Sequence, residues 1–340
     1  MEIKYLSLFS GIGGFELGIQ QAYESNNEHA RKCKKSEQKK CSQGRERSTH
    51  QHGSLLHSRD RATALCIGYS EIDKYAIQVY EKYFKHKNYG DITKIEPEKL
   101  PSFDLLVGGF PCQSFSIAGK RLGFHDTRGT LFFDIARILA EKRPRRLVLE
   151  NVKGLLSHDS GKTFQTILEV LADLGYSVEW QVLNSKNFGV PQNRERVFII
   201  GYLGGFPERK VFPIRGGNQE VNSRSGFQEQ NSATIFASQY KIARGMTLVA
   251  PVLTPDRPEK RQNGRRFKEN GEPSFTLTAQ DRHGIYDGTK IRRLTPLECE
   301  RLQGFPDNWT SDLSDTQRYK TCGNAVTVNV IEEIFKRLST

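Results

Sequence analysis

The chain has no long apolar run. No stretch of about 18 consecutive apolar residues, the length that indicates a transmembrane helix, occurs in its 340 residues. The first nine residues, MEIKYLSLF, lack the basic start and the small-residue cleavage site of a signal peptide. Its six cysteines are too few for a disulfide scaffold in a chain of this length. We therefore expect a cytoplasmic protein with mostly free thiols and no membrane partner.

A compact metal-binding pattern is also missing. Residues 26–62 contain Cys33, Cys41, His50, His52 and His57 among their cysteines and histidines. Their spacings match no zinc motif, although a metal site remains an alternative for this segment. The segment is rich in Lys, Ser, Gln, His and Arg and has hardly any apolar residues, which is typical of a solvated insertion. We therefore expect no metal.

Acidic residues are outnumbered by basic ones, and the formal net charge is +12. The excess is concentrated in two segments. Residues 26–62 hold ten Lys or Arg against four Asp or Glu, and residues 205–290 hold fourteen against nine. A basic surplus favours a polyanionic partner, although it can also serve solubility alone.

Short apolar strands alternate with helical stretches up to Gly204. The strands are expected at 3–9, 64–70, 103–107, 146–149, 177–184 and 196–202, and the helices at 15–23, 74–84, 131–142 and 161–174. This alternation predicts an α/β fold with a mostly parallel sheet and helices on both faces. Ligands of such sheets bind at the carboxyl ends of the strands.

The pattern changes after Gly204. Residues 205–290 are rich in Gly, Asn, Arg and Pro and have only short apolar runs, which indicates a separate, loop-rich domain. Regular structure is expected again at 294–303 and in an amphipathic helix over 326–338. The predicted domains are 1–204 with the insertion 26–62, then 205–290, and then 291–340, which returns to the first domain.

A glycine turn, Phe-Ser-Gly-Ile-Gly-Gly-Phe at residues 9–15, lies between the first strand and the first helix. Glycines let the backbone approach a ligand closely, and a helix N-terminus offers free N–H groups, but many ordinary turns look alike. Glu71 ends the second strand, where an acidic residue commonly binds ribose hydroxyls. Asp91 adds a carboxylate near the third strand. No lysine follows the glycines, so the pattern favours an adenosine moiety without a pyrophosphate.

Cys112 follows the third strand, on a predicted loop at the carboxyl edge of the sheet. A lone cysteine is usually structural, so a catalytic role for Cys112 depends on which residues lie near it. Glu150 closes the next strand at the same edge. Arg194 and Arg196 stand two residues apart just before another strand, so their side chains should point the same way. The pattern predicts a thiol, an acid and paired arginines beside an adenosine pocket.

Together these motifs resemble the cytosine-5 DNA methyltransferase family, most closely its bacterial modification enzymes. The matching motifs are Leu8–Phe15, Pro111–Gln113, Glu150–Val152, Gln192–Arg196, Arg292–Pro306 and Gly323–Val326. They occur in the family's order and cover almost the whole chain except 26–62 and much of 205–290. The resemblance implies a Rossmann-like, class I S-adenosylmethionine-dependent methyltransferase fold with a smaller, loop-rich target-recognition domain.

The resemblance also implies roles for particular residues. Cys112 would add to C6 of cytosine, and Glu150 would hydrogen-bond N3 and the exocyclic amine. Arg196 would contact O2 of the base, and Arg194 would support the loop. S-adenosyl-L-methionine would supply the methyl group. Its implied contacts are Phe9, Ser10, Gly11, Ile12, Gly13, Gly14, Glu71, Ile72, Asp91, Ile92, Pro111, Leu131, Asn324, Ala325 and Val326.

The implied partner is double-stranded DNA from which the target cytosine is flipped out. Binding should weaken with salt because it includes phosphate contacts. The implied DNA contacts are Gln113, Ser116, Thr276, Leu277 and Arg282, with Gln280 and Asn263 as further candidates for reading bases. Each of these candidates could equally be a solvated loop residue, and the target sequence is not readable from the chain.

Two other functions remain open. One is an RNA cytosine-5 methyltransferase of the same fold, although the Cys-Phe-Thr segment of the tRNA-modifying branch is not found. The other is a catalytically silent DNA-binding protein, which the complete set of site residues disfavours. The family also suggests a separate restriction endonuclease as a functional partner. We expect a monomer that is associated with the nucleoid through DNA.

Overall fold

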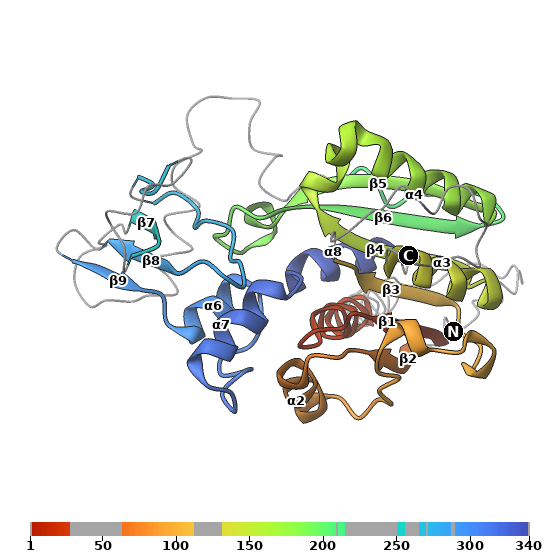
Figure 1. Cartoon of the computed structure of the whole chain (residues 1–340), viewed down its shortest axis with the longest axis horizontal. Coiled ribbons are helices and arrows are strands. Elements are labelled where there is room, and N and C mark those ends of the chain that lie inside the picture. Colours follow the sequence, from red (N-terminus) through yellow and green to blue (C-terminus); the bar gives the residue numbers. More distant parts are fainter. Residues whose placement is uncertain are drawn as a thin grey trace, which may run out of the picture.

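Six strands form the large sheet of the protein (Figure 1). The structure is a computed structural model that describes residues 2–27, 63–111, 131–208, 210–214, 250–255, 265–269, 271–286 and 290–338. The strands of this sheet are β1 (Glu2–Leu8), β2 (Thr63–Ser70), β3 (Leu105–Gly109), β4 (Arg146–Val152), β5 (Tyr176–Asn184) and β6 (Glu195–Leu203). Their order is β2-β1-β3-β4-β6-β5. The first four are parallel neighbours, and β6 runs antiparallel to β4 and β5. The predicted mostly parallel sheet is confirmed.

Two strands differ from the sequence prediction by two residues or more at an end, and the other four by no more than one residue at either end. The third strand was expected at 103–107, but β3 lies two residues further on. The fourth was expected to stop at 149, but β4 continues to Val152 because antiparallel β6 supplies partners as far as the pair of Val152 and Arg196. Glu150 therefore lies within a paired strand, which fixes its backbone more firmly than a loop would.

Helices cover both faces of the sheet, as predicted. On one face lie α3 (Leu131–Lys142) and α4 (Lys162–Asp173), and on the other lie a helix over residues 14–27 and α8 (Val328–Leu338). Three further helices, α2 (Lys74–Tyr83), α6 (Pro296–Leu302) and α7 (Asp315–Asn324), pack with one another in a separate core cluster. Alternate residues of a strand point to opposite faces. Leu147 and Leu149 of β4 accordingly pack in the core with α3 and α4, whereas Val148 packs with helix 14–27 and α8.

The last helix brings the end of the chain back to the first helix. The apolar residues of α8 (Val330, Ile331, Ile334, Phe335 and Leu338) are buried in the same core as Phe15 and Ile19. A Cβ atom at Gly18 would lie 2.7 Å from the Ile331 side chain, so the two helices can approach this closely only with glycine there. This packing places the turn after α7 beside the glycine turn after β1.

Helix 14–27 extends beyond its predicted end at residue 23, into the first two residues of the predicted insertion 26–62. Tertiary contacts account for the extra turn. Ser25 donates a hydrogen bond to Glu332, and the Asn26 amide donates to the carbonyl of Lys336, both on α8. The rest of the insertion, with its cysteines and histidines, lies outside the described residues.

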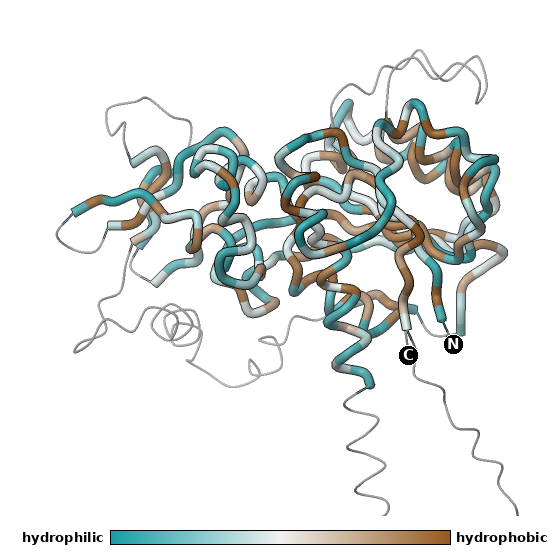
Figure 2. The backbone as a smooth tube through the Cα atoms, turned by 90° about the horizontal axis from the view of Figure 1, so that it is seen from below, coloured by the Kyte–Doolittle hydropathy of each residue, from teal (hydrophilic) through white to brown (hydrophobic). Residues whose placement is uncertain are grey.

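A second, three-stranded sheet follows the large one in the chain. It consists of β7 (Ala250–Leu253), β8 (His283–Tyr286) and β9 (Ile291–Arg293), all antiparallel. The predicted domain boundary at 290 falls between β8 and β9. In Figure 2 the hydrophobic segments gather in the part of the chain that holds the large sheet, whereas the part with β7–β9 is mainly hydrophilic. No helix among the described residues is long and apolar enough to span a bilayer.

Candidate active site

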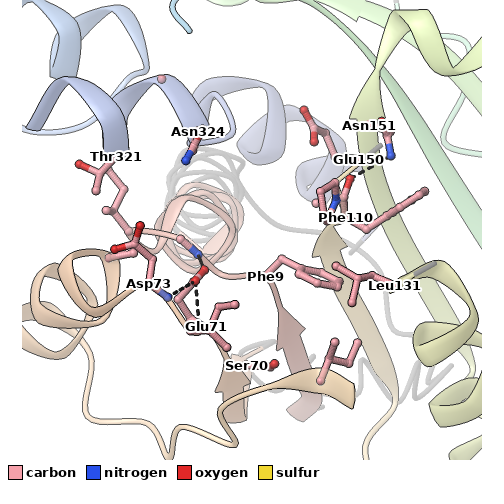
Figure 3. A pocket seen from close by; sticks show the side chains of 18 of the residues that line it. Phe9, Ser70, Glu71, Asp73, Phe110, Leu131, Glu150, Asn151, Thr321 and Asn324 are labelled. Carbon is pink, nitrogen blue, oxygen red and sulfur yellow. Dashed lines mark hydrogen bonds between the residues drawn. The ribbon is translucent and has the colours of Figure 1, made fainter. Parts of the chain in front are cut away.

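A cleft of about 530 Å³ opens at the carboxyl ends of the parallel strands. It is lined by the glycine turn, the start of α2, the ends of β3 and β4, the residues before β6 and the end of α7. Figure 3 shows Glu71 and Asp73 on one side and Glu150 with Asn151 on the other, with Phe9 between them. This is the edge of the sheet at which ligands of α/β folds bind.

The glycine turn packs closely on its outer side. Gly13 has a φ of +88°, and a Cβ atom there would lie 2.4 Å from the Phe84 ring. A Cβ atom at Gly14 would lie 2.8 Å from the Val326 side chain. Gly11 has a φ of +55° and leaves open space where its Cβ would be. The turn therefore needs glycine at 13 and 14 for packing and at 11 for its backbone conformation.

Glu71 is tied to that turn by its carboxylate. One oxygen accepts a hydrogen bond of 2.8 Å from the Gly11 N–H, and the other accepts from the N–H groups of Ile72 and Asp73 at 2.8 and 2.9 Å. The Ile72 side chain is 72% exposed at the rim of the cleft. The second strand thus offers the cleft a fixed carboxylate next to an apolar surface.

Asp91 also lines the cleft. Its carboxylate accepts from the N–H of Thr93 at 3.0 Å and from the Thr93 hydroxyl at 2.8 Å. These two bonds lower the pKa of Asp91 below its ordinary value. The side chain therefore stays ionised and oriented at neutral pH.

The other side of the cleft carries an ion pair. The Nε of Arg196 lies 2.9 Å from Oε1 of Glu150, and both side chains are largely buried. Arg196 also donates to the carbonyl of Glu195. Because Arg196 and Glu150 lie on the neighbouring strands β6 and β4, the sheet itself sets their spacing.

Arg194, the other predicted arginine, is 2% exposed. It donates to the carbonyls of Leu277 and Ala325 at 2.8 Å and of Gly323 at 3.3 Å. Burial, and then the positive charge of Arg196, lower its pKa. The two arginines therefore differ: Arg196 pairs with the acid, whereas Arg194 joins three segments of the chain.

The cleft gathers most of the residues predicted for the site. Those that line it are Phe9, Gly11, Ile12, Glu71, Ile72, Asp91, Ile92, Pro111, Leu131, Glu150, Arg194, Arg196 and Asn324. Five predicted cofactor contacts are not among its lining residues: Ser10, Gly13, Gly14, Ala325 and Val326. They lie behind it, where the Ser10 hydroxyl donates to Ser7 and Val326 packs on Gly14.

The predicted nucleophile and the residues predicted to contact DNA are only partly described. Cys112, Gln113, Ser116 and Asn263 lie outside the described residues, although Pro111, just before Cys112, lines the cleft. Arg282 and Gln280 are exposed. Leu277 is buried, and the Thr276 hydroxyl donates to the carbonyl of Asn193. The pair at 276–277 therefore docks on the residues that precede β6.

Two buried polar residues of the site were not predicted. Asn151 donates a hydrogen bond of 2.9 Å to the carbonyl of Phe110 (Figure 3). Gln192 accepts from the Leu277 N–H and donates to the carbonyl of Leu302, both at 2.8 Å. Both residues stand inside the recognised motifs. The signal was therefore present, but these partners are far away in sequence and a single sequence does not reveal them.

Comparison with known proteins identifies the family. A family model described as C-5 cytosine-specific DNA methylase matches residues 3–225 and 210–340. The chain is 43% identical over 330 residues to the type II methyltransferase M.NgoBI of Neisseria gonorrhoeae, covering 97% of this chain and 90% of that protein. It is 41% identical over 289 residues to M1.ScrFI of Lactococcus lactis subsp. cremoris, covering 79% and 70%. The solved structure of S. pombe Dnmt2 methyltransferase matches with a TM-score of 0.63 and 17% identity, covering 97% and 96%.

The architecture is thus that of the S-adenosylmethionine-dependent methyltransferases, as predicted. The chain belongs to the C-5 cytosine-specific DNA methylase family. It is an enzyme, a DNA (cytosine-5-)-methyltransferase related to type II modification enzymes.

Proposed function

We propose that the protein transfers the methyl group of S-adenosylmethionine to C5 of a cytosine that is flipped out of a specific duplex sequence. The observation that carries this proposal is that one cleft holds both the two carboxylates of adenosine-binding type, Glu71 and Asp91, and the Glu150–Arg196 ion pair. The names of its relatives favour a role as the modification member of a restriction–modification system.

The residues of the cleft fit the cofactor. Its volume of about 530 Å³ lies in the range of small-molecule sites. Glu71 keeps acceptor capacity toward ribose hydroxyls because each of its oxygens has two lone-pair sites. Ile72 offers apolar surface to the adenine ring, and Asp91 offers an acceptor. When bound, S-adenosylmethionine supplies an electrophilic methyl group.

The opposite side suits a cytosine ring. Glu150 can take part in hydrogen bonds to N3 and the exocyclic amine, which would stabilise the ring as C6 is attacked. Arg196 holds that carboxylate in place and presents further N–H groups, one of which would contact O2. The buried pair would thus recognise the Watson–Crick edge of a base that has left its duplex.

Cys112 completes the proposed chemistry as the nucleophile. Its thiolate would form a bond to C6, and the electron pair released to C5 would attack the methyl carbon, whose bond to the sulfonium sulfur would break to release S-adenosylhomocysteine. Loss of the C5 proton and elimination of the thiolate would then restore the aromatic ring. The cationic groups of Arg194 and Arg196 at the cleft would favour the thiolate over the thiol.

We further propose that residues 205–290 hold the DNA, as the predicted domain division implies. Their basic surplus and the exposed Arg282 support this assignment. The docking of Thr276 and Leu277 on the residues before β6 gives the segment a direct connection to the arginine pair.

Adduct trapping tests the proposal. The protein is incubated with S-adenosylmethionine and duplex DNA that contains 5-fluorocytosine, whose fluorine blocks the final elimination. Wild type should form a denaturation-resistant protein–DNA adduct, whereas Cys112→Ala should form none yet still bind DNA. Bisulfite sequencing of DNA from expressing cells supplies the duplex sequence. Methyl transfer by Cys112→Ala, or transfer to tRNA in preference to DNA, would overturn the proposal.

A further inference from the structure

Trp309 connects the C-terminal part of the chain to the glycine turn. Its indole Nε1–H donates a hydrogen bond of 2.9 Å to the carbonyl of Ile12, although the two residues are 297 positions apart. Trp309 is 6% exposed and Ile12 is 1% exposed, so water does not replace this bond. Ile12 lines the cleft, whereas Trp309 is not among the lining residues. Trp309 therefore contacts the glycine turn from the side that faces away from the cleft.

The carbonyl that accepts the hydrogen bond from Trp309 lies in a part of the backbone with high conformational freedom. Ile12 is flanked by Gly11 and Gly13, both with positive φ. Glycine populates both signs of φ readily, so the peptide groups between these glycines have little intrinsic orientation. A buried carbonyl without a partner is unfavourable, so the indole N–H selects the orientation in which this bond forms.

The indole ring is itself fixed against the end of α2, outside the cleft. It stacks on Tyr83 of α2, with ring centroids 3.6 Å apart and an angle of 6° between the planes. The Tyr83 hydroxyl donates to the Trp309 carbonyl at 3.0 Å. Because α2 begins next to Glu71 and Asp73, Trp309 joins the glycine turn to the helix whose first turn lines the cleft.

We infer that Trp309 is a positioning residue for the cofactor. It sets the orientation of the Ile12 peptide group and the spacing between the glycine turn and α2. This inference rests on the proposed binding of S-adenosylmethionine in the cleft. The residue touches no reacting atom, so it should affect binding of the cofactor rather than the chemical step.

The test is Trp309→Phe, which keeps an aromatic ring but removes the N–H donor. The dissociation constant and the KM for S-adenosylmethionine should rise about tenfold, which corresponds to about 1.4 kcal/mol. The kcat at saturating cofactor should stay within about twofold of wild type. The matched control is Trp180→Phe, because Trp180 lies on β5 and is 45% exposed. It should leave both constants unchanged.

A fluorescence measurement covers the case in which Trp309→Phe does not fold. The chain has two tryptophans, so Trp309 is the remaining emitter in the Trp180→Phe variant. Its emission should change saturably with S-adenosylhomocysteine, at the concentrations over which calorimetry shows binding.

Four results separate the possible failures. An unchanged cofactor KM in Trp309→Phe, or an emission that does not respond to bound S-adenosylhomocysteine, would overturn the role of Trp309 alone. A loss of kcat at unchanged KM would do the same. If wild type itself binds no S-adenosylmethionine in calorimetry, the proposed function fails instead.

Discussion

The side-chain amide of Asn151 donates a hydrogen bond of 2.9 Å to the carbonyl of Phe110, two residues before Cys112. The same side chain accepts from the N–H of Val152 at 2.8 Å. Asn151 is 1% exposed. Its bond to Phe110 fixes the end of β4 against the end of β3, and its bond from Val152 orients the amide for that contact. The proposed acid and the chain that leads to the proposed nucleophile are thereby held together.

Asn151→Asp should separate these two bonds. The aspartate keeps the acceptor for Val152 but replaces the donor to Phe110 with an oxygen that repels the carbonyl. We expect kcat to fall about a hundredfold, because displacing a reacting group by roughly 1 Å has an effect of this size. Steady-state methyl transfer to DNA is the measurement. A kcat close to wild type in a folded variant would show that the Phe110 carbonyl needs no such donor.

The Glu150–Arg196 pair leads to a second prediction. Glu150→Gln keeps the shape of the side chain but removes its charge and its capacity to share a proton. The kcat should fall by about two to four orders of magnitude, the range typical of acid–base groups. Arg196→Lys should also lower kcat, because an ammonium group cannot reproduce the guanidinium fork.

Glu195→Gln is the matched control for that pair. Glu195 stands next to Arg196 but forms an exposed ion pair with Lys153. Exposed pairs of this kind contribute little to stability, and the pair does not line the cleft. If Glu195→Gln lowers kcat as much as Glu150→Gln does, the effect is one of general charge and not of the pair.

Glu71 should act on cofactor binding rather than on chemistry. The Glu71 carboxylate accepts from the N–H groups of Gly11, Ile72 and Asp73. In Glu71→Gln one of the two accepting oxygens becomes an amide nitrogen, which cannot accept, so at least one of these N–H groups loses its partner. We expect the dissociation constant for S-adenosylmethionine to rise at least about tenfold, as when buried donors lose charged partners. Calorimetry is the measurement. Glu96→Gln, at an exposed ion pair with Lys99, should bind the cofactor like wild type.

The sequence predicted correctly those elements whose formation depends mainly on residues close together in the chain. The helix over 131–142 has the predicted ends, and its apolar residues, such as Ile135 and Leu139, recur at helical spacing on the buried face. The glycine turn and the acid at the end of β2 were also legible, since strand ends meet at one edge of a parallel sheet. The family resemblance then indicated the reaction, methylation of cytosine at C5.

Contacts between residues far apart in the chain could not be predicted from a single sequence. The C-terminal end of β4 depends on β6, and the extra turn of helix 14–27 depends on α8. Asn151 and Trp309 owe their roles to partners that become neighbours only in the folded chain. Leu277 was predicted as a DNA contact from its motif, and its burial against the residues before β6 was not foreseen.

Glu16 should make the stability of the protein depend on pH. It stands in the first turn of helix 14–27, fully buried, and accepts a hydrogen bond from the Tyr80 hydroxyl. Burial raises the pKa of Glu16 from 4.5 to about 7, against the opposing hydrogen bonds of Ser7, Tyr80 and Ser10. Between these two values the folded chain binds a proton that the unfolded chain has released.

The free energy of unfolding should therefore fall as pH rises through this window, by about 3 kcal/mol from this group. Glu16→Gln resembles the protonated acid and cannot ionise, so its stability should lack this component of the decline. Urea unfolding at several pH values between 5 and 8 compares the two proteins. Glu24→Gln, on the exposed side of the same helix, should follow wild type. Parallel pH profiles of wild type and Glu16→Gln would mean that Glu16 ionises in the folded protein as readily as in the unfolded chain.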